Sequence, residues 1–306
     1  MDRLYGVKLY DPQFCNSRTI DLLQEAGFNT VYLGRDALVP AFTEELSSRG
    51  LFWNIVEPVF LAQGDEELAT LEDGSPASDS WVRFVCPTDA VHLNNVRWRI
   101  ASDVRIFNPP GMSLDFLRFF QFWEMTSPSA EAESLPKSCF CPRCRSQRMG
   151  MERPEFWRQN IVEQTALTLC SQIRQMNPDI KIGLHCVPWT RDMYDGAILN
   201  VIGQNFSNLA EIGDYLTPMV YHHMIHREPS YIREFLQDME SLGCTEILPS
   251  IQVKKAYRED EMSTEEFGEA LGYALESPSK GVLLYKWEDL VSDSDRLEIV
   301  RSMLKN

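Results

Sequence analysis

Eight short segments rich in β-branched or aromatic residues recur along the chain, and most are followed by a helical pattern. This alternation constrains the fold more than any other feature, because strands that alternate with helices form a parallel sheet rather than a sandwich. It predicts a (β/α)8 barrel of the TIM type, with residues 1–306 as one domain. The predicted strands are Tyr5–Tyr10, Thr30–Leu33, Phe52–Val56, Met112–Phe116, Lys181–Cys186, Tyr215–Tyr221, Ile247–Ile251 and Val282–Tyr285.

Helix start and stop signals lie between the predicted strands. Ser17–Ala26 is expected to be a helix with a Ser cap, since Gly27 follows its end. Ser263 and Glu266 have the spacing of a capping box at the start of another helix.

The composition excludes some partners. With 29 basic and 45 acidic residues, the net charge of −16 repels phosphate backbones and anionic membranes. The N-terminus lacks the apolar core of a signal peptide, and no later run is long enough for a membrane span. We therefore expect a soluble cytoplasmic protein that binds neither nucleic acid nor membrane, and the sequence gives no indication of an oligomer surface.

Two connections, at about residues 61–91 and 120–154, are too long to be simple barrel loops. They follow the third and fourth predicted strands, so each connection begins at the carboxyl end of its strand. Barrel enzymes build their active sites on that face, so both loops are candidates for function.

The second of these loops contains Cys139-Phe-Cys141-Pro-Arg-Cys144. Three thiols at this spacing can converge on one ion, and a structural zinc site takes four such ligands. Cys86 in the other long loop is the candidate for the fourth, so zinc would join the two loops without an open coordination position. Unligated reduced thiols are the alternative. No organic cofactor is expected.

Asp115 and Arg118 stand in an otherwise apolar strand pattern. A buried charge costs several kcal/mol unless it is paired or lies at a wet cavity, so Asp115 is expected to point into a pocket at the end of its strand. An Asp115–Arg118 ion pair that closes the strand end is the alternative.

Glycoside cleavage uses two carboxyl groups, one charged and one protonated. Asp115 fits the charged role, with Arg118 favouring its ionised form. Glu124 and Glu57 compete for the protonated role, because apolar neighbours could raise the pKa of either. We prefer Glu124, which follows Asp115 on a loop directed at the barrel mouth, although a surface carboxylate remains the alternative for it.

Polar and aromatic side chains near the strand ends suit a sugar, because aromatic rings cover pyranose C–H surfaces while polar groups bind hydroxyls. The predicted substrate-binding residues are Lys8, Tyr10, Asn54, Arg118, Trp123, His185, Tyr221, His222, Gln252, Lys286 and Trp287.

These motifs resemble two families. The fourth-strand carboxylate, the preceding Cys86-Pro-Thr and the following cysteine cluster are similar to the barrel domain of β-galactosidases that hold a structural zinc. This resemblance implies zinc ligation by Cys86, Cys139, Cys141 and Cys144. Ser113–Arg118 and Asp214–Tyr221 resemble strands of uncharacterised barrel-type glycoside hydrolases.

The chain also departs from the galactosidase pattern. That pattern has an Asn-Glu pair on the fourth strand and a nucleophilic Glu on the seventh, where this chain has Ser113-Leu-Asp115 and Ile247–Val253. The galactosidase mechanism and specificity are therefore not implied.

The sequence favours a glycoside hydrolase that acts on a small soluble glycoside or oligosaccharide. A metal-dependent sugar isomerase or deacetylase, with His185, His222 and His226 as ligands, is one alternative. A non-catalytic barrel that only binds carbohydrate is another, because fold does not determine activity.

Overall fold

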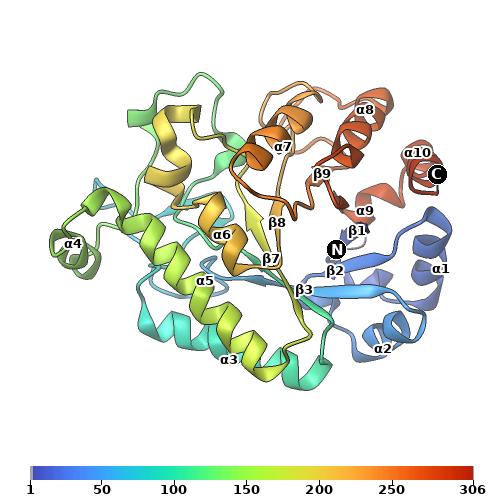
Figure 1. Cartoon of the computed structure of the whole chain (residues 1–306), viewed down its shortest axis with the longest axis horizontal. Helices are drawn as coiled ribbons and strands as arrows, with labels where there is room; N and C mark the ends of the chain where they lie inside the picture. The colour runs from blue at the N-terminus through green and yellow to red at the C-terminus, as the bar shows by residue number, and fades with distance from the viewer. Residues whose placement is uncertain (1–2, 306) are drawn as a thin grey trace.

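The computed structural model describes residues 3–305. Its eight parallel strands form one sheet that curves into the wall of a barrel (Figure 1). The strand order is β8-β7-β6-β3-β2-β1-β10-β9, and bridges from Leu216 to Ile247 and from Met219 to Ser250 join the two outer strands into a nearly closed barrel. The strands are β1 (Leu4–Leu9), β2 (Thr30–Leu33), β3 (Phe52–Pro58), β6 (Gly111–Asp115), β7 (Lys181–Cys186), β8 (Tyr215–Pro218), β9 (Ser250–Gln252) and β10 (Gly281–Tyr285). The predicted fold is confirmed.

Two strands are shorter than predicted. The strand expected at Ile247–Ile251 begins only at Ser250, because Pro249 lacks the N–H that a sheet ladder needs, and Ile247 forms isolated bridges instead. The strand expected to reach Tyr221 ends at Pro218 for the same reason.

Helices surround the barrel (Figure 1). They are α1 (Ser17–Ala26), α2 (Pro40–Ser48), α3 (Ala90–Phe107), α4 (Pro142–Met149), α5 (Trp157–Met176), α6 (Phe206–Ile212), α7 (Tyr231–Ser241), α8 (Thr264–Leu275), α9 (Trp287–Leu290) and α10 (Ser294–Leu304). Short 3-10 turns occur at Pro12–Phe14, Arg35–Ala37, Trp123–Met125, Ala132–Ser134, Pro154–Phe156 and Met193–Gly196, and a π turn at Ile198–Ile202.

The helix caps agree in part with the prediction. Ser263 Oγ accepts the N–H of Glu266, as the capping box requires. The cap of α1 is Asn16 rather than Ser17, since Asn16 Oδ1 accepts the N–H of Thr19 from the extended backbone that a cap residue needs.

The barrel interior contains a layer of aromatic and polar side chains. Tyr32 and Tyr215 share a hydrogen bond of 2.9 Å, and Tyr215 donates to Asn54 Oδ1 at 3.2 Å. Glycine makes room for this layer: a Cβ at Gly111 would lie 2.2 Å from Asn54 Oδ1. This layer lies inside the sheet, whereas the larger apolar core lies between the sheet and the helices.

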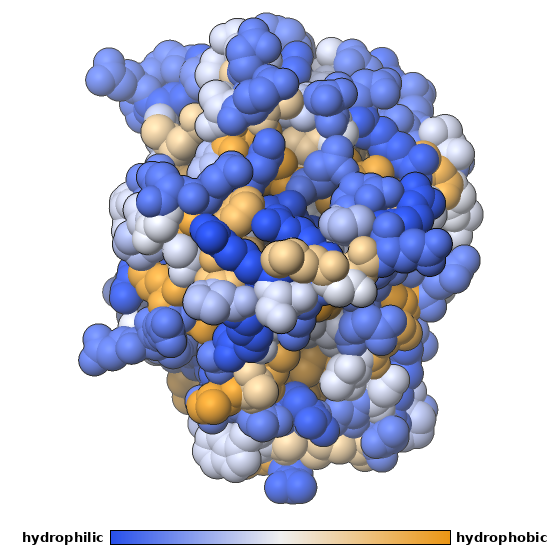
Figure 2. All heavy atoms as spheres, turned by 90° about the vertical axis from the view of Figure 1, so that its left-hand side faces the viewer, coloured by the Kyte–Doolittle hydropathy of each residue, from blue (hydrophilic) through white to orange (hydrophobic). Residues whose placement is uncertain are grey.

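The two long insertions contact each other at the carboxyl ends of the strands. The first contains a small hairpin, β4 (Ser78–Asp79) and β5 (Val82–Arg83). The second joins it where Phe140 donates its N–H to the carbonyl of Thr70 at 2.8 Å. Figure 2 shows the side of the molecule that bears α4, where apolar patches interrupt a mainly hydrophilic surface. Among the described helices, each is too short or too polar to cross a bilayer.

Candidate active site

A cavity of about 380 Å³ opens at the carboxyl ends of the strands. We call it the reaction cavity. Strand ends and both insertions contribute its walls, which include Lys8, Tyr10, Asp36, Trp81, Asp115, Glu124, Tyr221, Tyr257, Tyr285 and Lys286. The cavity therefore combines carboxylates, amines and aromatic rings.

Asp115 is the last residue of β6 and is 6% exposed. Its Oδ1 accepts the N–H of Phe116 at 2.7 Å, and its Oδ2 lies 3.9 Å from Nδ1 of His185. Phe116 has a positive φ of 51°, a conformation that costs a non-glycine residue about 1 kcal/mol or more and is concentrated at functional sites. The backbone here turns sharply and gives the carboxylate its own N–H donor.

The charge of Asp115 is stabilised. Burial alone would raise its pKa, but His185, Lys8 and the Phe116 N–H together hold the pKa below the usual value. Burial lowers the pKa of His185 to about 3, so this ring is neutral at pH 7. At neutral pH the opposing charge therefore comes from Lys8, with a smaller contribution from Arg118.

Glu124 lies in the 3-10 turn Trp123–Met125 of the second insertion. The residue is half-buried, but its Oε2 is fully enclosed and has no hydrogen-bond partner within residues 3–305. Burial raises its pKa to about 7, although the charge of Arg118 opposes this rise. With this pKa, a substantial fraction of Glu124 carries a proton at pH 7, whereas an exposed glutamate would be ionised.

Arg118 is buried beside both carboxyl groups. Its Nη1 donates to the carbonyls of Gln121 at 2.7 Å and Phe119 at 3.3 Å, and its guanidinium lies over the ring of Phe84 at 4.8 Å. Arg118 thus fixes the start of the loop that carries Glu124 and adds positive charge near both acids.

Lys8 lies at the base of the reaction cavity. Its Nζ is 3.3 Å from His185 Nδ1 and 3.5 Å from the hydroxyl of Tyr221. Burial lowers its pKa to about 8, against the charges of Asp115 and Glu124. Lys8 is therefore mostly charged at pH 7.

Aromatic rings line the wall beside Lys8. Tyr221 stacks on Tyr285 with ring centroids 5.3 Å apart, and Trp123 lies on Tyr221 at 5.8 Å. Tyr10 contacts the edge of Tyr285, and it packs so closely over Gly34 that a Cβ there would lie 2.3 Å from its ring. The fold thus brings the predicted residues Tyr10, Trp123 and Tyr221 together with Tyr285, which was not predicted for the site.

Of the predicted substrate-binding residues, Lys8, Tyr10, Tyr221 and Lys286 line the cavity. Arg118, Trp123 and His185 do not line it but contact Phe116, Tyr221 and Lys8, which do. The other four make contacts elsewhere within the protein. Asn54 accepts from Tyr215 inside the barrel, and Gln252 is bonded to the N–H of Met224 and the carbonyl of Lys254. His222 Nε2 lies 3.0 Å from Glu266, and Trp287 packs against Phe28.

Glu57 is fully buried in an ion-pair network. Arg35 contacts its Oε2 at 2.5 Å, and Arg99 of α3 contacts its Oε1 at 2.6 Å. Side chains alternate along a strand, so Asn54 and Val56 point into the barrel while Glu57 points towards the helices. This alternation explains why Glu57 does not join Asp115 in the cavity lining.

Trp81 and Tyr257 line the reaction cavity and were not predicted. Trp81 stands at the turn of the β4–β5 hairpin, and its Nε1 donates to the hydroxyl of Tyr257 at 2.9 Å. A tryptophan in a polar, turn-rich insertion was the available signal for the first residue. The sequence around Tyr257 offers no comparable signal.

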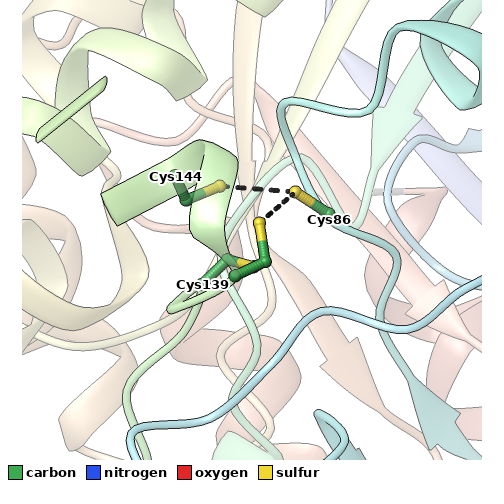
Figure 3. A group of neighbouring side chains, drawn as sticks. Cys86, Cys139 and Cys144 are labelled. Atoms are coloured by element: carbon green, nitrogen blue, oxygen red, sulfur yellow. Dashed lines mark hydrogen bonds between the residues drawn. The ribbon is translucent and has the colours of Figure 1, made fainter. Parts of the chain in front are cut away.

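Four cysteines form a candidate metal centre in the two insertions. Figure 3 shows three of them, Cys86, Cys139 and Cys144, with their sulfurs directed towards one another. The sulfurs of Cys86, Cys139, Cys141 and Cys144 all lie within 4.8 Å of one another, and Cys86 is 3.4 Å from Cys144. Around a tetrahedral zinc with bonds of about 2.3 Å, sulfurs stand roughly 3.8 Å apart, so the donor set and its spacing fit this ion. Among residues 3–305, this is the one group with the geometry for a metal, while His185 and His222 have separate partners.

No model of a known protein family matches the chain, and no curated protein matches its sequence. Solved structures do match. The glycoside hydrolase domain of PgaB (BpsB) from Bordetella bronchiseptica is similar with a TM-score of 0.74 at 11% identity, over 99% of each chain. A β-galactosidase from Halorubrum lacusprofundi matches with a TM-score of 0.69 at 10% identity, over 99% of this chain and 57% of that one.

The glycoside hydrolase domain of PelA from Pseudomonas aeruginosa matches with a TM-score of 0.55 at 12% identity, over 93% of this chain and 96% of that one. The chain spans nearly the full length of the two hydrolase domains but little more than half of the β-galactosidase. At these identities the likeness shows the fold alone: the chain has the barrel found in these glycoside hydrolases.

Proposed function

We propose that the chain is a glycosidase that cleaves a small soluble glycoside or oligosaccharide. The observation that carries the proposal is the opposite state of two carboxyl groups in one cavity. Asp115 has a lowered pKa and is ionised, whereas Glu124 has a pKa of about 7 and is substantially protonated. Glycoside cleavage needs this pairing of a charged and a protonated carboxyl group.

In this proposal, Glu124 donates its proton to the glycosidic oxygen as the bond to the sugar breaks. Asp115 stabilises or attacks the positive charge that develops at the sugar carbon. Lys8 would keep Asp115 ionised, and Tyr10, Tyr221 and Lys286, which line the cavity, would contact sugar hydroxyls. The fold shared with glycoside hydrolases supports the assignment.

We further propose that Cys86, Cys139, Cys141 and Cys144 bind a structural zinc. Four thiolates leave no open coordination position, so the ion would fix the two insertions rather than act on substrate. Glu124 and Trp81 belong to those insertions and line the reaction cavity, so their placement would depend on this cluster.

The proposal is tested with aryl α- and β-glycosides of common sugars, using wild-type protein, Asp115→Asn and Asp65→Asn. Asp65 is an exposed carboxylate in the first insertion and is the matched control. Turnover of at least one glycoside that Asp115→Asn abolishes and Asp65→Asn retains supports a glycosidase. Turnover that survives in Asp115→Asn, or its absence on every glycoside, contradicts the proposal.

A further inference from the structure

A second hollow, of about 370 Å³, lies between the two insertions next to the reaction cavity. Its walls come from the hairpin and from the loop that carries Glu124, and include Leu71, Ser78, Asp79, Gln121, Thr126 and Ser127. Nothing in the proposed reaction uses this space.

An aromatic wall separates the hollow from the reaction cavity. Phe122 borders the hollow, and its ring centroid lies 5.2 Å from Tyr257 and 6.1 Å from Trp81. Tyr257 and Trp81 line the reaction cavity on the other side. A ligand longer than one sugar unit could therefore extend from the cavity over this wall into the hollow.

The wall carries exposed aromatic surface. Trp81 is 48% exposed and Tyr257 is 44% exposed, although both are held by their mutual hydrogen bond. Rigid, partly exposed rings at a cavity mouth are suited to stacking on the apolar face of a pyranose.

Gln121 supplies a polar group that the protein leaves unused. The side chain is 4% exposed, and its Nε2 donates to Thr126 Oγ1 at 2.9 Å, which fixes the orientation of the amide. Its Oε1 is buried and has no hydrogen-bond partner in the described part of the chain. Leaving such an acceptor unsatisfied costs about 1–3 kcal/mol, a cost that a ligand hydroxyl would remove.

We propose that the hollow binds a further sugar unit of an oligosaccharide whose cleaved bond lies in the reaction cavity. This inference rests on the proposed function and specifies its substrate: a chain of sugars is preferred to a single glycoside. Among the described residues that line the hollow there is no lysine or arginine, so a sugar without anionic groups fits it best.

The test measures, by calorimetry, the binding of oligosaccharides to the Asp115→Asn variant. This substitution leaves the hollow unchanged, because Asp115 does not line it. The probes are β-1,4-, β-1,6- and α-1,4-linked oligosaccharides of glucose, galactose and N-acetylglucosamine, one to six units long. In at least one series, affinity should rise about tenfold or more when the chain becomes long enough to reach the hollow, the gain that one stacked sugar would give. Adding Trp81→Ala should remove this gain, and Trp81→Phe should restore part of it.

Trp98→Ala is the matched control, because Trp98 is 70% exposed on α3 and lines neither the hollow nor the reaction cavity, whereas Trp81 belongs to the aromatic wall between them. The inference is overturned if affinity is independent of chain length in every series, or if Trp81→Ala binds like Trp98→Ala. Thermal unfolding of each variant excludes a folding defect as the cause.

The two proposals fail separately. Turnover of an aryl glycoside that depends on Asp115, without any effect of chain length, supports the glycosidase and overturns the role of the hollow. Binding that depends on chain length and on Trp81, without turnover by the wild-type protein, supports the hollow and contradicts the glycosidase.

Discussion

Nζ of Lys8 on β1 lies 3.3 Å from Nδ1 of His185 on β7, across the base of the barrel mouth. A lysine ammonium can only donate, so Nδ1 must accept and the proton of the neutral ring is on Nε2. Lysine and histidine can both carry positive charge, but here they are packed together because burial keeps His185 neutral. Asp115 lies next to this pair, and Lys8 supplies the charge that favours its ionised form.

We predict a bell-shaped dependence of kcat/KM on pH. Activity should fall as pH rises through about 7, where Glu124 loses its proton, and fall in acid only below the usual pKa of an aspartate. Lys8→Met removes a cation and should raise the pKa of Asp115, which moves the acidic limb to higher pH. The pH profiles of the wild type and of Lys8→Met are compared. An acidic limb at the same pH in both would show that Lys8 does not lower the pKa of Asp115.

Glu124→Gln should make the protein more stable at high pH. A carboxyl whose pKa is higher in the folded than in the unfolded state stabilises the fold at low pH, and this contribution is lost as pH rises towards about 7. A shift from 4.5 to about 7 corresponds to roughly 3 kcal/mol at most. Thermal unfolding of both proteins at pH 4 and pH 8 should therefore show a larger benefit of Glu124→Gln at pH 8. An equal difference at the two pH values would show that Glu124 has no raised pKa.

Glu57→Gln tests which glutamate is the acid. Glu57 is enclosed between Arg35 and Arg99, and breaking a buried ion-pair network costs about 3 kcal/mol or more. We expect a lower unfolding temperature but, well below it, a kcat/KM within about tenfold of the wild type. If Glu57→Gln instead abolishes turnover in a folded protein and Glu124→Gln does not, the acid is Glu57.

Purified protein should contain one zinc per chain, bound by the four cysteines. Cys144→Ala should lose the ion on dialysis against a chelator and unfold several degrees lower, because metal binding contributes directly to folding. Cys170→Ala is the control, since Cys170 is an equally buried helical cysteine outside the cluster. Elemental analysis and thermal unfolding decide the result. Full zinc content in Cys144→Ala would contradict the assignment.

The sequence predicted the barrel because strand and helix signals alternate locally, and the largest errors in the strands occur at Pro218 and Pro249, which end or delay the hydrogen-bonded ladder. The spacing of Cys139, Cys141 and Cys144 predicted three members of the cluster, and the place of Cys86 in the other long loop made it the candidate for the fourth. Asp115 was recognisable because a carboxylate is conspicuous in an apolar strand.

The positions of Glu57, Trp81 and Tyr257 depend on the three-dimensional fold, which the sequence patterns do not specify. Glu57 and Asp115 both follow apolar strand residues, but the alternation of side chains directs Glu57 to the helices, where Arg99 of α3 contacts it. Trp81 and Tyr257 meet although 176 positions separate them, because the first insertion folds onto the connection between β9 and α8.

The most direct test of the central claim compares two leaving groups on the sugar that the wild-type protein cleaves. Glu124→Gln should lose about 10²–10⁴-fold in kcat on a glycoside with a poor leaving group, but much less on a dinitrophenyl glycoside, whose departure needs no proton. Asp115→Asn should lose activity on both. Equal losses of Glu124→Gln on the two substrates, or an active Asp115→Asn, would contradict the assignment of these carboxyl groups.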